Sequence, residues 1–100
     1  MLLHIVNKSP FDTNAIDSCL KNAADGSAIL LIEDGIYAAI NNSKVSDKVK
    51  SAMSNLTVYA LEPDIKARGM QDKIMEGIKM VDYNGFVDLT VEHGAVQSWL

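Results

Sequence analysis

The sequence is poor in cysteine and lacks long apolar runs, and each shortage excludes a class of protein. The single cysteine, Cys19, in a chain of 100 residues rules out an internal disulfide framework and is typical of a reducing compartment, so we expect the cytoplasm. The apolar runs, such as residues 28–32, are far shorter than the roughly 20 residues that span a bilayer. No basic flank precedes the apolar start, so we expect no signal peptide.

Basic charge is also scarce. The formal net charge is −4 and the sequence pI is near 4.9, and the nine lysines and arginines are scattered along the chain. A protein that binds nucleic acid through its phosphates needs a basic face. We therefore expect no direct contact with DNA or tRNA.

The chain length suits one compact unit. One hundred residues can form one hydrophobic core but not two. No repeat, linker or low-complexity segment interrupts the sequence, so residues 1–100 are predicted to form a single domain.

Strand and helix patterns alternate along the chain. Short runs rich in apolar or β-branched residues predict strands at 2–6, 28–32, 56–61 and 78–81, with a further short strand allowed at 96–100. Between them lie segments with helical spacing or helix caps. This alternation predicts an α/β fold, a mostly parallel sheet of four to five strands with helices on both faces.

The first helix is predicted to run from a cap at Asp12 or Thr13 to about Asp25, where Gly26 closes it. Its apolar residues, Ile16, Cys19, Leu20 and Ala23, form one stripe, with Cys19 toward the edge of that stripe.

The later helices carry similar signals. Residues 36–40 predict a short helix, and Ser46 is predicted to cap the next one. Pro63 suits the start of another helix, which Gly69 ends. Residues 84–93 predict the last helix, closed by Gly94.

Acidic side chains follow the predicted strands. Glu33, Asp34, Asp64 and Asp82 stand where ligands collect in an open parallel sheet. They could hold Mg²⁺ as oxygen ligands. The alternative, which we favour, is that they cap helices and solubilise the surface. No phosphate-binding glycine motif accompanies them, so no cofactor is predicted.

The two histidines do not form a metal site. Zinc takes three or four ligands at short spacings, whereas His4 and His93 lie at opposite ends of the chain. His4 is predicted to be a hydrogen-bonded residue of a core strand. His93 is predicted to interact with the C-terminal end of its helix.

Cys19 is the only residue with a nucleophilic thiol. A cysteine can accept sulfur as a persulfide and pass it to another thiolate, but it needs exposure and a lowered pKa. No basic residue lies one helical turn from Cys19 on either side. From the residues alone, Cys19 is either a sulfur carrier or, as free cysteines often are, a small buried apolar side chain.

Four segments in order resemble the DsrH/TusB family and together cover almost the whole chain. They are residues 4–11 (HIVNKSPF), 33–39 (EDGIYAA), 59–69 (YALEPDIKARG), and 82–90 (DYNGFVDLT) with the closing 97–99 (QSW).

This resemblance implies a DsrE-like fold and membership of a sulfur-relay heterohexamer. The partners would be DsrE/TusD-like and DsrF/TusC-like subunits, and sulfur would pass to a DsrC/TusE-like carrier. Such complexes act in sulfur oxidation (DsrEFH) or in tRNA 2-thiouridine synthesis (TusBCD). In the family, the principal sulfur-accepting cysteine lies on the DsrE/TusD subunit.

The segment 16–21 (IDSCLK) resembles the DsrH version of the first helix, which carries a cysteine there. The resemblance therefore makes Cys19 a candidate persulfide acceptor and favours sulfur oxidation, with a structural subunit of a TusBCD-type complex as the alternative. We further expect apolar surface for a partner, with some self-association of the isolated chain. The candidates for this surface are Met53, Met70, Met75, Met80 and Trp99.

Overall fold

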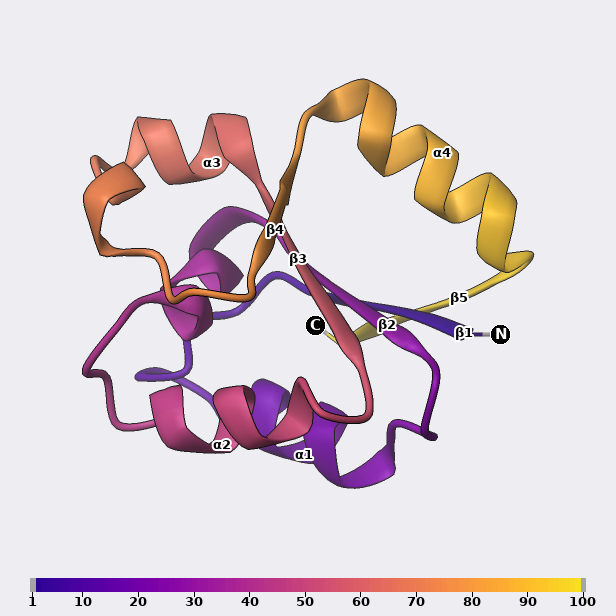
Figure 1. The fold of residues 1–100 in the computed structure, drawn as a ribbon, viewed down its shortest axis with the longest axis horizontal. Coiled ribbons are helices and arrows are strands. Elements are labelled where there is room, and N and C mark those ends of the chain that lie inside the picture. The colour runs from indigo at the N-terminus through magenta and orange to yellow at the C-terminus, as the bar shows by residue number, and fades with distance from the viewer. Residues whose placement is uncertain (1, 100) are drawn as a thin grey trace.

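The computed structural model describes residues 2–99 and contains one sheet of five parallel strands in the order β4-β3-β2-β1-β5 (Figure 1). The strands are β1 (Leu2–Val6), β2 (Ala28–Leu31), β3 (Thr57–Leu61), β4 (Lys79–Val81) and β5 (Ala95–Trp99). The α-helices are α1 (Ala15–Asn22), α2 (Ser46–Ala52), α3 (Glu62–Ala67) and α4 (Tyr83–His93). Two 3₁₀ helices, η1 (Glu33–Ala39) and η2 (Gln71–Lys73), complete the described elements.

The predicted α/β class and parallel sheet are confirmed, and the short run near the C-terminus is a fifth strand. From β1 to β4 the chain adds each strand on the same side of the preceding one, and α4 then carries it back to place β5 beside β1. Leu100, which the sequence assigned to this last strand, lies outside the described residues.

Helices cover both faces of the sheet, as predicted. In Figure 1, α1 and α2 lie below the sheet and α4 lies above it. The larger core lies under α1, α2 and η1 and includes Val6, Cys19 and Leu31. The smaller core lies under α4, where Leu89 packs with residues such as Leu3. Because successive side chains of a strand point to opposite faces of the sheet, β1 contributes residues to both cores.

Several local predictions need correction. Helix α1 is shorter than expected: Asn14 precedes it without a side-chain capping bond, and Ala23 is already extended. Gly26 does adopt a left-handed conformation (φ 85°), but in the turn before β2 rather than at the end of the helix. Ser46 does not cap α2, since it is the first residue of that helix and its hydroxyl donates to the carbonyl of Ser43.

Gly35 sets how closely η1 approaches the end of β1. A Cβ atom on this residue would lie 2.2 Å from the carbonyl oxygen of Val6, closer than non-bonded atoms can approach. Only glycine therefore lets η1 pack directly on the carboxyl end of the sheet. This contact helps to define the edge where the acidic residues gather.

No helix among residues 2–99 is long and apolar enough to cross a membrane.

Candidate functional site

Cys19 lies on the sheet-facing side of α1. Ile16 and Cys19 are the buried residues of this helix, and the Cys19 side chain has no exposed surface. It belongs to the larger core together with apolar residues such as Val6 and Ile29. The predicted position at the edge of the apolar stripe is therefore wrong, because α1 turns Cys19 directly onto the sheet.

Burial determines the chemistry of this thiol. Desolvation raises the pKa of Cys19 to about 12, because the charged thiolate is not stabilised by its apolar surroundings. At pH 7 roughly one molecule in 10⁵ would then carry the thiolate. A sulfur acceptor needs the opposite properties, exposure and a lowered pKa. In this conformation Cys19 is a small apolar side chain.

His4 lies in β1 and is buried, with 2% of its surface exposed. The indole Nε1–H of Trp99 donates a hydrogen bond of 3.0 Å to His4 Nδ1. An indole can only donate, so Nδ1 is the acceptor and Nε2 carries the proton of the neutral ring. This confirms the predicted hydrogen-bonded residue and links β1 to the last described strand.

The second nitrogen of His4 does not activate Cys19. His4 Nε2 is buried without a hydrogen-bond partner among residues 2–99, so the Cys19 thiol does not hydrogen-bond to it. Burial lowers the pKa of His4 and thus favours the uncharged ring. The structure therefore does not bring the two residues together as a catalytic pair.

The acidic strand ends serve hydrogen bonds and ion pairs. The Asp64 carboxylate accepts a hydrogen bond of 2.7 Å from the backbone N–H of Glu33. Glu33 itself has a positive φ of 50°. The Arg68 guanidinium lies 3.0 Å from Asp34 and 3.9 Å from Asp64. Asp82 caps α4 by accepting the Gly85 N–H at 2.8 Å. Each of these bonds agrees with the helix-capping and surface role that we favoured from the sequence.

The Mg²⁺ alternative gains no support from this geometry. No group of three histidine, cysteine or carboxylate side chains converges as a metal site within residues 2–99.

His93 interacts with the backbone of its own helix. Its Nδ1 lies 2.8 Å from the carbonyl oxygen of Leu89, one turn back in α4.

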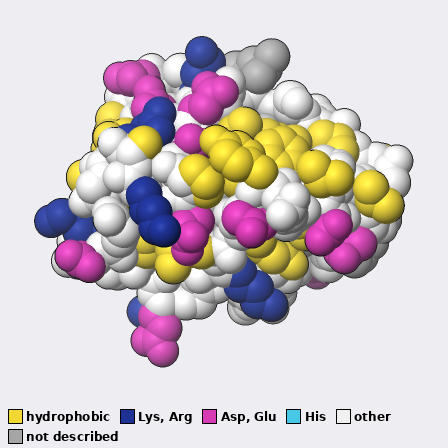
Figure 2. All heavy atoms as spheres, turned by 90° about the horizontal axis from the view of Figure 1, so that it is seen from above, with side chains coloured by type: hydrophobic (Ala, Val, Ile, Leu, Met, Phe, Trp, Pro, Cys, Tyr) yellow, Lys and Arg dark blue, Asp and Glu magenta, His cyan; other side chains and the backbone are white. Residues whose placement is uncertain are grey.

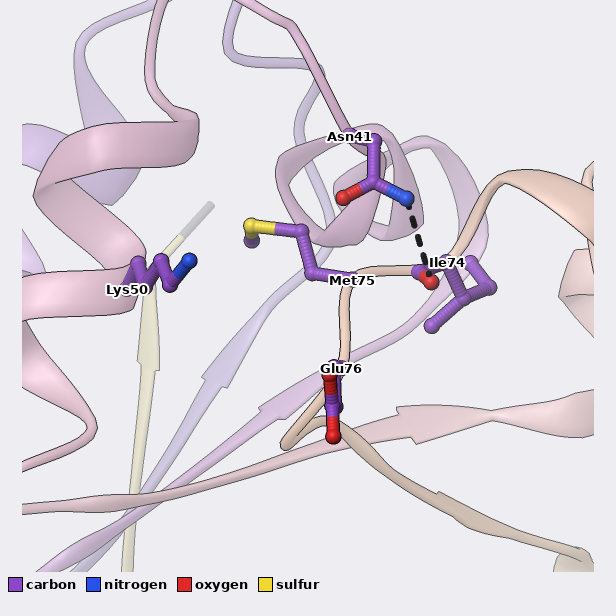
Figure 3. Close-up of a pocket in the computed structure, with 5 residues that line it drawn as sticks. All are labelled: Asn41, Lys50, Ile74, Met75 and Glu76. Carbon is purple, nitrogen blue, oxygen red and sulfur yellow. Dashed lines mark hydrogen bonds between the residues drawn. The ribbon is translucent and has the colours of Figure 1, made fainter.

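A pocket of about 350 Å³ lies beside α2 (Figure 3). Its lining residues are Asn41, Lys50, Ile74, Met75 and Glu76. The Asn41 amide donates to the Ile74 carbonyl at 3.4 Å, and the Met75 side chain extends toward Lys50. The polar groups of this lining are Asn41, Lys50 and Glu76, and it contains no thiol or histidine.

The predicted apolar contact residues are mostly covered. Met75 is buried, and Met53, Met70 and Trp99 pack partly buried against the larger core. Of the five, Met80 is the one with substantial exposure, at 48%.

Sequence reasoning missed the outward side of α4. Tyr83, Val87 and Val91 are 62%, 60% and 75% exposed. Figure 2 shows hydrophobic side chains gathered on this face of the molecule. The signal was present in the sequence, because Val87 and Val91 are one helical turn apart and lie away from the buried Leu89.

A profile of the DsrH like protein family matches residues 8–96. The chain belongs to the DsrH-like family. Proteins named TusB match it over 98% of its length and over the whole of their own. The one from Pectobacterium parmentieri is 35% identical, and the one from Escherichia coli (strain K12 / DH10B) is 34% identical.

Solved structures support the DsrE-like fold of this DsrH-like chain. The crystal structure of the YchN protein from E. coli superposes with a TM-score of 0.81 and 13% identity over 97% of both chains. A Methanobacterium thermoautotrophicum protein of unknown function superposes with a TM-score of 0.74 and 17% identity over 97% of this chain and 96% of that one. At these identities the likeness concerns the fold alone.

Proposed function

We propose that this DsrH-like chain is a structural subunit of a TusBCD-type sulfur-relay complex that serves tRNA 2-thiouridine synthesis. The observation that carries the proposal is the burial of the Cys19 thiol. The resemblance to the DsrH/TusB family implies that the principal sulfur acceptor lies on another subunit. The full-length similarity to proteins named TusB supports the same choice.

The proposal gives the chain partners rather than a reaction of its own. Its partners are a TusD-like and a TusC-like subunit in a cytoplasmic heterohexamer, and a TusE-like carrier takes the sulfur onward. The acidic charge of the chain, −4, suits a subunit that does not touch the tRNA itself.

Sulfur oxidation in a DsrEFH-type complex is the second candidate. It is supported by the match to the DsrH profile and by the cysteine in the first helix. In this version, the Cys19 thiolate attacks the outer sulfur of a persulfide donor. The donor leaves as a thiolate and Cys19 gains one sulfur atom. Because Cys19 is buried, α1 would have to move away from the sheet before this step.

A deletion strain separates the two candidates. Tandem mass spectrometry of digested tRNA measures 2-thiouridine, and the consumption of reduced sulfur compounds measures oxidation. The proposal predicts loss of 2-thiouridine and its restoration by both wild-type chain and Cys19→Ala. Normal 2-thiouridine with defective sulfur oxidation would instead favour the second candidate. Failure of a folded Cys19→Ala chain to restore activity would contradict a purely structural role.

A further inference from the structure

Helix α4 is apolar on two opposite sides. Leu89 is buried and Phe86 partly buried in the smaller core under the helix. Tyr83, Val87 and Val91 follow at intervals of four residues and project from the other side, each more than half exposed. A helix at a free surface normally places polar residues there. Apolar residues on two opposite sides are typical of a helix that is covered on both of those sides.

The apolar surface continues onto the sheet beside α4. Val96 in β5 is 45% exposed and pairs in register with Leu3 of the smaller core, so both side chains point to the α4 side of the sheet. We call the four residues Tyr83, Val87, Val91 and Val96 the α4 surface.

The formally charged side chains on α4 itself, Asp88 and Glu92, are both acidic. Asp88 and Glu92 are exposed and one turn apart, so they form an acidic row along the Val87–Val91 strip. Neither forms an ion pair among the described residues, and residues 80–100 contain no lysine or arginine. Figure 2 shows acidic side chains beside the hydrophobic ones on this face.

This charge pattern disfavours an antiparallel pair of copies and favours a partner with basic residues. If two copies paired antiparallel through α4, the acidic row of one copy would lie against the same row of the other, and the like charges would repel. A different chain that carries lysines or arginines beside an apolar strip would bury the valines and pair with Asp88 and Glu92. Complementary charge of this kind selects partners as well as speeding their association.

We propose that the α4 surface is the face by which this chain docks onto a different protein subunit with an apolar strip bordered by basic residues. This proposal rests on the proposed function, in which the partners are TusC-like and TusD-like subunits. It adds the face of this chain to which one of them binds and the residues that bind it. The valines contribute buried apolar area, and the acidic row selects the partner.

The test uses the full chain co-expressed with the TusC-like and TusD-like subunits of its own organism. One variant, Asp88→Lys with Glu92→Lys, reverses the acidic row, and a second, Val87→Ser with Val91→Ser, removes the apolar strip. All four side chains are exposed, so both variants should keep the fold, which circular dichroism of the isolated chain checks. Asp47→Lys, an exposed change on α2 at the opposite face, is the matched control.

We expect each α4 variant to lower the affinity for the partner at least tenfold and the control to leave it unchanged. Hydrogen exchange of the wild-type complex should show new protection of α4, and binding should weaken as salt is added. This inference alone would be overturned if both α4 variants bound the partner as tightly as wild type and hydrogen exchange showed no protection of α4 in the wild-type complex. It would also be overturned if the isolated chain formed a homodimer in which α4 is protected from hydrogen exchange. If the wild-type chain forms no complex with these subunits, the proposed function fails as well.

Discussion

Replacing Cys19 by alanine and by serine separates the two roles open to this residue. The side chain has no exposed surface and packs in an apolar core. If Cys19 acts only as a small apolar group, alanine should be the milder substitution and serine the more damaging one. A water-accessible, reactive cysteine would tolerate serine well.

The magnitudes follow from burial. Cys19→Ala removes one buried heavy atom, comparable to the loss of a methylene, and should cost about 1 kcal/mol of unfolding free energy. Cys19→Ser loses the same apolar contact and also buries a hydroxyl, which adds about 1–3 kcal/mol when the hydroxyl has no partner. A bond back to the carbonyl of Ala15, four residues earlier in the helix, would bring this addition toward its lower end. We expect a total of about 2–3 kcal/mol for serine.

Urea unfolding of the isolated chain, followed by circular dichroism, measures both values. For a domain of this size each kcal/mol also lowers the Tm by about 4–8 °C. Equal stability of wild type and Cys19→Ser would refute the reasoning, because it would mean that the side chain at this position reaches water. Modification of the native thiol by a disulfide reagent as fast as in the unfolded chain would contradict it too.

Two further predictions concern the fold. His4 has a lowered pKa, so the unfolded chain binds more protons than the folded one below pH 6.5. The unfolding free energy should therefore decrease as the pH falls below 6.5, and the decrease should be smaller in His4→Gln; equal pH profiles for the two proteins would contradict this. Gly35→Ala should cost about 1–3 kcal/mol or more, because its Cβ would meet the Val6 carbonyl. Gly69→Ala is the control, because an added Cβ at Gly69 would meet no other atom and only the positive φ of 65° would be strained. This variant should cost about 1 kcal/mol of unfolding free energy. Equal costs of the two variants in urea unfolding would show that η1 can shift to accommodate the methyl group at position 35.

The sequence predicted the elements of this fold well because their signals are local. The buried strands at Leu2–Val6 and Ala28–Leu31 consist of apolar residues on both faces, and Gly94 marks the end of α4 with a φ of 69°. The order of the strands was not predictable, since it depends on contacts between distant segments. Nothing near Trp99 in the sequence indicates that its indole bonds to His4 at the other end of the chain.

Cys19 shows why a helical pattern alone could not define the site. A helical wheel gives the spacing of apolar residues but not the direction in which the sheet lies. Helix α1 begins only at Ala15 and faces the sheet with both Ile16 and Cys19, so a residue predicted at the edge of the stripe is fully buried. Conversely, the sequence shows that Val87 and Val91 lie on the side of the helix away from Leu89, but the position of the sheet under Leu89 is needed to show that this side is the exposed one.

Intact mass spectrometry of the assembled complex after exposure to a persulfide donor tests the structural role most directly. The account predicts a gain of about 32 Da, one sulfur atom, on the TusD-like subunit and no change in the mass of this chain. A gain of about 32 Da on this chain that disappears in Cys19→Ala would contradict the account and make Cys19 a sulfur carrier.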